Sequence, residues 1–186
     1  LKSVKFYKWV YLYSSLSFQS IKKDTKYPHY EILLVSNNSI EKETLAYMDE
    51  LNSIKEARLY TYDEAFNYSA INNWAVERAN GKYILFLNND IEILSDNWLG
   101  IMHGHFCNPK TASVGCKLIY PDYRIQHGGV IIGIAGVADH AFKFFPHDAP
   151  GYFYRSSVCG NYSACTAACL ISPKKLFIEA GGFNEK

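Results

Sequence analysis

The sequence has almost no net charge and no long apolar run. Its 19 basic and 18 acidic side chains leave a formal charge of +1. Without a basic surplus there is no broad field to hold nucleic acid, so any anionic ligand must be bound locally. The longest weakly polar stretch, 128–138, has 11 residues with four glycines, whereas a membrane-spanning helix needs about 20 apolar residues. We therefore expect no nucleic-acid binding and no membrane span in this chain.

The chain also lacks the cysteine pattern of a disulfide framework or a zinc site. It has five cysteines, an odd number, with no Cys-x-x-Cys pair, so we expect reduced and mostly buried thiols. Its start has lysines among aromatic residues but no apolar block followed by a cleavage site, so it does not resemble a secretory leader. These absences predict a cytoplasmic location. The basic, aromatic start leaves open a peripheral contact with the inner face of the membrane.

The composition that remains is that of a globular domain. With 186 residues, 48% hydrophobic and 20% charged, the chain is near the size of a single domain and can bury one sizeable core. It shows no internal repeat, no low-complexity segment and no long linker. The sequence therefore predicts one domain over residues 1–186.

Strand-like and helix-like patterns alternate along the first 110 residues. Short Ile, Leu and Val runs that end in polar loops are typical of buried parallel strands. Amphipathic spacing with capping residues indicates the helices between them. The alternation predicts an α/β fold, with a mostly parallel sheet and helices on both faces. We expect strands at 31–35, 58–62 and 83–87, and helices at 8–23, 41–54, 67–79 (capped by Asn67 or Ser69, stopped at Asn80-Gly81) and 95–106 (capped by Ser95 or Asp96).

The texture changes after about residue 112. Strand-like segments at 114–120 and 125–134 flank a turn at 121–124, which predicts a hairpin. Residues 136–160 are predicted to form a long loop, and the small, apolar residues 163–171 a core strand. The Ser172-Pro173 pair begins a short helix that Gly181-Gly182 closes. We therefore expect a hairpin and loop region after the main sheet.

Polar clusters follow two of the predicted parallel strands, at Ser36 to Ser39 and at Asn88 to Asp90. Ligands of open parallel sheets bind outside the carboxyl ends of the strands. A carboxylate there can hold a divalent cation that bridges it to a phosphate, which makes Asp90 a candidate metal ligand. The alternative is that Asp90 only satisfies backbone groups of the turn that ends its strand. A dinucleotide oxidoreductase is disfavoured because no Gly-x-Gly-x-x-Gly motif follows an early strand.

Six segments, in this order and spacing, give the chain a resemblance to a known family. They are YPHYEILLVSNNS (27–39), FNYSAINN (66–73), GKYILFLNND (81–90), KLIYPD (117–122), QHGGV (126–130) and GGFNE (181–185). From about Leu16 to Glu185 the chain resembles the family 2 glycosyltransferases of the GT-A (Rossmann-like) fold, in particular their rhamnosyltransferase-like branch.

The resemblance implies a metal-dependent, inverting transfer of a sugar from a nucleoside-diphosphate sugar to a glycan or lipid-linked acceptor in bacterial surface polysaccharide synthesis. Residues 1–110 would form the nucleotide-binding half of the catalytic domain, and residues 111–186 the donor-sugar and acceptor half. The alternative is a non-catalytic domain that binds a nucleotide sugar or a carbohydrate and retains the fold.

The same resemblance assigns roles to single residues. It places Asn37 near the base and Asn89 on the ribose or sugar side, and it makes Asp90 the ligand of Mg²⁺ or Mn²⁺. It implies that Asn67 and Asn73 line or support the nucleotide pocket. The alternatives for these two are a helix cap and a buried helix polar group.

His127 has two interpretations as well. It could reach the donor phosphates or the acceptor, or it could be a structural group paired inside the fold. The chain also departs from the family pattern in three ways. Ser36 stands where the family usually has aspartate, no opening strand is recognisable before Leu16, and the acidic motif with the general base is expected beyond Lys186. We therefore expect a catalytic domain truncated at both ends.

Overall fold

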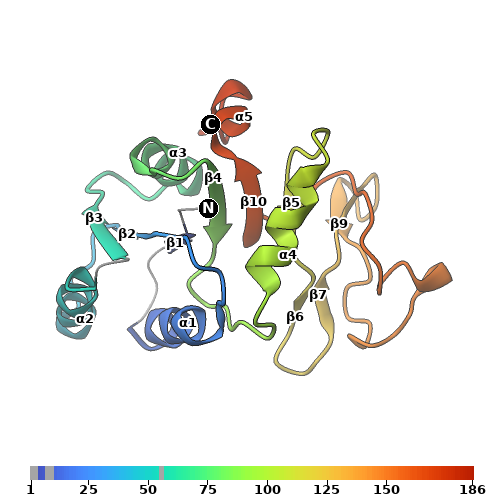
Figure 1. Cartoon of the computed structure of the whole chain (residues 1–186), viewed down its shortest axis with the longest axis horizontal. Helices are drawn as coiled ribbons and strands as arrows, with labels where there is room; N and C mark the ends of the chain where they lie inside the picture. Colours follow the sequence, from blue (N-terminus) through green and yellow to red (C-terminus); the bar gives the residue numbers. More distant parts are fainter. Residues whose placement is uncertain (1–3, 7–10, 55–56) are drawn as a thin grey trace.

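The computed structural model describes residues 4–6, 11–54 and 57–186. Six strands form the main sheet in the order β3-β2-β1-β4-β10-β5 (Figure 1). The first four in this order run parallel, and β10 and β5 add an antiparallel edge. The strands span β1 Val4–Phe6, β2 Ile32–Ser36, β3 Ala57–Thr61, β4 Tyr83–Leu87, β5 Val114–Gly115 and β10 Cys169–Pro173.

The opening strand that we did not expect is present as β1. It lies between β2 and β4, with Val4 opposite both Ile32 and Leu85. The prediction of no strand before Leu16 is therefore wrong. Lys5 interrupts the apolar run of this three-residue segment, so the segment lacks the local pattern of a buried strand. Its pairing is set by the two neighbours that hydrogen-bond to it on either side.

Helices cover both faces of the sheet, as predicted (Figure 1). Alternate strand residues point to opposite faces, so Leu85 and Leu87 pack into one cluster and Ile84 and Phe86 into another. The first cluster contains side chains of α1 Tyr11–Asp24, α2 Lys42–Asn52 and α4 Trp98–Gly104. The second is covered by α3 Tyr68–Arg78 and α5 Lys174–Glu179.

The second half of the chain adds two small hairpins. The predicted hairpin around 121–124 is confirmed, because β6 Leu118–Ile119 pairs with β7 Ile125–His127. A further hairpin joins β8 Val130–Ile132 to β9 Ala138–His140. Residues 136–160 are therefore not loop throughout: they contain β9 and a 3₁₀ turn, η2 Tyr152–Tyr154. A second 3₁₀ turn, η1 His105–Cys107, follows α4.

The strand predicted at 163–171 lies later in the chain, at Cys169–Pro173. Residues 163–168 are small, so they have little side chain to pack in the core. They bond to other segments instead: Val130 N–H donates to Ala164 O over 2.9 Å, and Asn88 N–H donates to Ala168 O over 2.9 Å. This segment therefore links β8 to the end of β4.

Three predicted helix ends are confirmed or corrected. Asn67 caps α3 and accepts a hydrogen bond from Ala70 N–H over 3.0 Å, as expected. Neither Ser95 nor Asp96 caps α4, which begins at Trp98 after Asn97. Gly181 and Gly182 close α5 as predicted, and they do so in the left-handed conformation, with φ of 88° and 73°.

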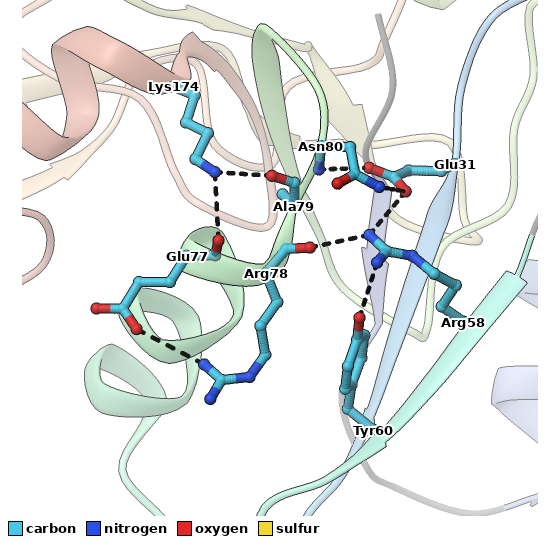
Figure 2. Close-up of polar contacts among 8 residues, drawn as sticks. All are labelled: Glu31, Arg58, Tyr60, Glu77, Arg78, Ala79, Asn80 and Lys174. Atoms are coloured by element: carbon cyan, nitrogen blue, oxygen red, sulfur yellow. Dashed lines mark hydrogen bonds and ion pairs between the residues drawn. The ribbon is translucent and has the colours of Figure 1, made fainter.

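The predicted glycine stop of α3 is wrong, because Ala79 ends the helix in an extended conformation. Long cationic side chains bond to its last carbonyl groups instead (Figure 2). Arg58 donates to Arg78 O over 2.9 Å, and Lys174 Nζ donates to Ala79 O over 2.7 Å. Arg58 is held in turn by an ion pair of 2.7 Å with Glu31. These side chains satisfy groups that a helix end leaves unpaired.

All five cysteines are free, as predicted, but most are not buried. Cys169 is buried, two are partly exposed, and Cys107 and Cys159 are exposed. Over the ranges that the structure describes, no helix combines the length and apolar character needed to cross a bilayer.

Candidate nucleotide-sugar site

The polar segments predicted to form a site both follow parallel strands of the same sheet. Residues 36–39 come at the end of β2 and residues 88–90 at the end of β4, with β1 between these strands. Because β2 and β4 are both parallel to β1, their carboxyl ends lie at the same edge of the sheet, where ligands of such folds bind.

Asn37 joins the loops after β2 and β3. It is 4% exposed, and its amide nitrogen donates to Tyr62 O and to Glu64 O, each over 2.8 Å. Tyr62 N–H also donates to Ser36 O over 2.8 Å. No described residue donates to the side-chain oxygen Oδ1 of Asn37. This oxygen therefore remains a hydrogen-bond acceptor at the strand ends.

The turn after β4 is held by a residue of α1 rather than by its own aspartate. Ser17 Oγ donates to Asn89 O over 2.6 Å and accepts from Ile91 N–H over 3.0 Å. Asn89 is buried, whereas Asp90 is exposed. The Asp90 carboxylate makes no hydrogen bond or ion pair with any described residue. The two backbone groups that Ser17 bonds therefore do not depend on Asp90.

His127 lies inside the fold. Its side chain is 1% exposed, and its Nδ1 is 2.6 Å from Nδ1 of His140 on β9. Its Nε2 accepts from Thr166 N–H over 3.4 Å. Burial, and then the charge of His140, lower the pKa of His127 from 6.5 to about 4. A neutral ring suits this position because Nε2 must accept the backbone hydrogen bond.

The histidine pair is connected to the turn after β4. The Thr166 hydroxyl accepts from Ala168 N–H over 3.3 Å, and Ala168 O accepts from Asn88 N–H over 2.9 Å. His127 therefore supports the segment that borders the Asn88-Asp90 turn, while its own ring faces the interior. The ring has no exposed atom with which to meet a phosphate in this conformation.

Asn67 and Asn73 tie α3 to residues 183–185. Asn67 donates to Glu185 O over 2.8 Å, in addition to capping the helix. Asn73 donates to Phe183 O over 2.8 Å and accepts from Phe183 N–H over 2.9 Å. Of the alternatives left open by the sequence, the cap is confirmed for Asn67. Asn73 is partly exposed and bonds α3 to the backbone of Phe183, so it is not a buried polar group of the helix.

The residues present fit a metal that is shared with a ligand. In the described part of the chain, no group of three or more His, Cys, Asp or Glu side chains could hold a metal ion by itself. Mg²⁺ typically uses one or two protein carboxylates together with substrate phosphates. Asp90, and Glu92 two residues later, are exposed carboxylates at the strand end, so they match that donor set.

Sequence reasoning missed Ser17 and Thr166, and it did not pair His140 with His127. Ser17 lies 72 residues from Asn89, and Thr166 lies 39 residues from His127. No local spacing connects such pairs. Recognition of β1 would have placed α1 next to β4 and would have made Ser17 a candidate.

The fold is that of the GT-A glycosyltransferases. A mannosyltransferase from Pyrobaculum calidifontis, PcManGT, solved in complex with GDP-Man and Mn²⁺, is similar over 100% of this chain and 48% of its own, with a TM-score of 0.69 and 13% identity. Staphylococcus aureus TarS 1–349 is similar over 100% of this chain and 50% of its own, with a TM-score of 0.63 and 13% identity. At these identities the likeness shows the fold alone.

The family itself is shown by the sequence: residues 15–166 match the Glycosyl transferase family 2 model, and the chain belongs to this family. Two relatives are each 40% identical over 168 residues, or 90% of this chain. One is the O-antigen biosynthesis protein RfbC of Myxococcus xanthus, and the other is the uncharacterized protein y4gI of Sinorhizobium fredii (strain NBRC 101917 / NGR234). The chain spans only 13% and 18% of the lengths of these relatives.

Proposed function

We propose that the protein transfers a sugar from a nucleoside-diphosphate sugar to a glycan or lipid-linked acceptor, with inversion, in bacterial surface polysaccharide synthesis. Family membership and the 40% identity to a protein named for O-antigen biosynthesis support this proposal. The complex of PcManGT with GDP-Man, and that of S. aureus TarS 1–349 with UDP-GlcNAc (TM-score 0.54 and 16% identity over 63% of this chain), support a donor of this class. The rhamnosyltransferase-like branch of the family belongs to the same proposal.

The exposed, unpaired carboxylate of Asp90 is the observation that carries this function. It stands at the carboxyl end of β4, and the turn around it is held by Ser17. Asp90, with Glu92 nearby, would hold Mg²⁺ or Mn²⁺, which when bound supplies positive charge to neutralise the departing diphosphate. Without such a cation the carboxylate would repel the diphosphate.

Other residues of the chain would bind and orient the donor. Asn37 would offer its carbonyl oxygen on the nucleotide side, and Asn89 would face the ribose or sugar. Asn67 and Asn73 would act indirectly, because they fix residues 183–185 against α3. Inverting transfer also needs a carboxylate that takes the proton of the acceptor hydroxyl, and we place that general base outside the present residues.

The proposed location is the cytoplasm, with peripheral contact at the inner face of the membrane. Nucleoside-diphosphate sugars are charged and do not cross a membrane unaided, so a donor of this class would be available to the protein in the cytoplasm. The basic, aromatic start of the chain could contact anionic lipid. Flotation with vesicles that contain an anionic phospholipid tests the contact. Absence of the protein from the floating fraction at low salt would remove the membrane part of the proposal.

Donor binding by calorimetry tests the role of Asp90. We expect UDP-GlcNAc or GDP-Man to bind the wild-type protein at least about tenfold more tightly with Mn²⁺ than without it. Asp90→Ala and Asp90→Asn should remove this difference. Glu92→Gln should lose less of the difference than Asp90→Ala, and Asp49→Asn, which changes an exposed carboxylate on α2, is the matched control and should keep the difference. A Mn²⁺ effect that survives in Asp90→Ala would exclude Asp90 as the metal ligand.

Turnover separates the transferase from a binding domain that has lost its chemistry. The whole protein, supplied with the donor that binds, should release nucleoside diphosphate faster when a lipid-linked or glycan acceptor is added. Donor binding without any acceptor-dependent release would favour the non-catalytic alternative.

A further inference from the structure

A pocket of about 380 Å³ lies beside the β8 strand, away from the turn that carries Asp90. Its lining includes three aromatic residues, Phe142, Tyr152 and Tyr162, and two residues with polar side chains, Arg155 and Asn161. Its volume falls in the range of small-molecule sites, about 300–1,000 Å³. A mostly apolar pocket with a few polar groups is the usual form of such a site.

Glycine residues make room for two of the aromatic walls. Gly129 has φ of 107°, and a Cβ there would lie 2.2 Å from the Tyr162 ring. Gly151 has φ of 64°, and a Cβ there would lie 3.1 Å from Phe142. Tyr162 is also held by its hydroxyl, which donates to Arg155 O over 3.4 Å. The rings of Tyr162 and Phe142 are therefore positioned by the backbone, whereas Tyr152 is 75% exposed and borders the opening.

Two polar residues of the lining, Arg155 and Asn161, have side chains that are unpaired within the described part of the chain. The other arginines of the chain, Arg58, Arg78 and Arg124, each pair with a carboxylate. In the part of the chain that the structure describes, the Arg155 guanidinium and the Asn161 amide make no hydrogen bond or ion pair. Both residues are exposed at the lining of the pocket, so their polar groups can bond to a ligand there.

We propose that this pocket binds a saccharide unit that carries an anionic group, either a carboxylate or a phosphate, as part of the acceptor; this role rests on the proposed transferase function. The aromatic rings would pack against the apolar C–H face of the sugar. Arg155 would bind the anionic group with its forked N–H groups. Asn161 can both donate to and accept from sugar hydroxyls.

The position of the pocket suits an acceptor. Ser163 lines the pocket, and its backbone N–H donates to Val130 O over 3.2 Å. Five residues later along the chain, the carbonyl oxygen of Ala168 accepts from Asn88 N–H at the end of β4. Five residues span at most about 18 Å. A glycan of a few sugars could therefore occupy the pocket and extend toward the strand ends where the donor is proposed to bind.

Saturation-transfer NMR on the whole protein, without donor, tests the pocket directly. The test ligands are D-glucuronate, glucose 6-phosphate and neutral D-glucose, with inorganic phosphate as a competitor. We expect a larger saturation-transfer signal from glucuronate or from glucose 6-phosphate than from glucose. The anionic sugar with the larger signal shows whether the pocket prefers a carboxylate or a phosphate. If phosphate alone displaces glucose 6-phosphate completely at equal concentration, the pocket binds an anion and not a saccharide, and the proposal is wrong.

Variants assign the signal to this pocket. Arg155→Gln should weaken binding of the anionic sugar about tenfold or more and leave binding of glucose unchanged, whereas Arg155→Lys should weaken it less. Tyr152→Ala should weaken both sugars. Tyr154→Ala is the matched control, since Tyr154 is 68% exposed, does not line the pocket and makes no ring contact with Tyr152. Equal effects of Tyr152→Ala and Tyr154→Ala would overturn the proposal.

Donor calorimetry on the same variants keeps the two proposals apart. Arg155→Gln should bind donor with Mn²⁺ as the wild type does. If the protein binds an anionic sugar in the pocket but binds no donor, the pocket proposal stands and the proposed transferase function is wrong. If it binds donor but no sugar gives a saturation-transfer signal, the pocket proposal is wrong, also where another segment of the whole protein covers the pocket.

Discussion

Single residues at the site fall into those that face a ligand and those that hold the chain. Asp90 is exposed and unpaired, while Ser17 and His127 bond backbone groups around the same strand end. The division follows from burial. A buried polar group must be hydrogen-bonded inside the fold, so His127, at 1% exposure, is already committed to His140 and Thr166.

The free energy of unfolding should depend on the protonation of His127. Its pKa is about 4 in the folded chain against 6.5 for an unperturbed histidine, so the unfolded chain binds more protons between these pH values. The contribution of neutral His127 to the free energy of unfolding is therefore complete above pH 6.5 and is lost as the pH falls toward 4. Because one pKa unit corresponds to about 1.4 kcal/mol, the free energy of unfolding should fall by up to about 3 kcal/mol over this range.

Urea unfolding at pH 7.0, 5.5 and 4.5 measures this loss. His127→Gln keeps an acceptor for Thr166 N–H but has no proton to gain, so its unfolding free energy should fall less between pH 7.0 and 4.5. Carboxylates with lowered pKa values that lie away from His127 and its partner, such as Asp96 and Asp122, contribute equally in both proteins. Identical pH dependence in the two proteins would mean that His127 does not titrate abnormally.

The positions of the site residues were predictable where local sequence decides them. Asn37, Asn89 and Asp90 directly follow apolar strands, and that pattern places them at the strand ends. The partner of His127 was not predictable, because β8 and β9 bring His140 to it through tertiary pairing. Whether Asp90 faced solvent or its own turn also depended on a contact with α1.

At the scale of elements, the strands of the parallel sheet with continuous apolar runs were predicted well, and β1 and β9, which contain charged residues, were not. Tyr83–Leu87 agrees with its prediction to the residue, because five consecutive apolar residues in a parallel sheet can face helices on both sides. β1 and β9 have three residues each. β1 contains a lysine, and β9 contains an aspartate and a histidine. Such segments are strands because of the strands beside them.

The link between α3 and residues 181–185 depends on two glycines that differ in their surroundings. A Cβ at Gly182 would lie 2.6 Å from Asn73 Oδ1, whereas a Cβ at Gly181 meets nothing within 4 Å. Both have positive φ. Gly181→Ala should therefore cost about 1 kcal/mol of stability for the backbone conformation alone. Gly182→Ala should cost about 1–2 kcal/mol more, because it disturbs the hydrogen bonds of Asn73 to Phe183.

Chemical denaturation of the two variants checks this difference, with Gly181→Ala as the matched control. Asn73→Ala should make the two glycine variants nearly equal, since the contact that separates them is then absent. If Gly181→Ala and Gly182→Ala are equally stable with Asn73 present, Asn73 does not hold this segment.

At the scale of the whole molecule, the two ends of the sheet have different roles. The carboxyl ends of β2 and β4 carry the exposed Asp90 and the acceptor oxygen of Asn37. At the start of β2 and β3, Glu31 and Arg58 pair with each other (Figure 2). Arg58 also donates to Arg78 O in the last turn of α3, and Glu31 accepts from Asn80 N–H just beyond the helix. One end leaves polar groups available to a ligand, and the other end uses them within the fold.

Substitutions at the two ends should therefore separate stability from donor binding. Arg58→Met removes the ion pair with Glu31 and the hydrogen bond to Arg78 O, and should lower the free energy of unfolding by about 1–3 kcal/mol. Donor affinity with Mn²⁺ should not change. Asp90→Ala should weaken donor binding and change stability by less than about 0.5 kcal/mol, as expected for an exposed, unpaired side chain.

Urea unfolding and donor calorimetry on the same samples test this separation. Lys175→Met is the control for loss of a surface charge, because the Lys175–Glu179 pair is exposed at both ends and should contribute less than about 0.5 kcal/mol. A loss of donor affinity in Arg58→Met that matches the loss in Asp90→Ala would mean that the strand ends are coupled through the sheet. In that case the network at Arg58 would be part of the donor site as well as of the fold.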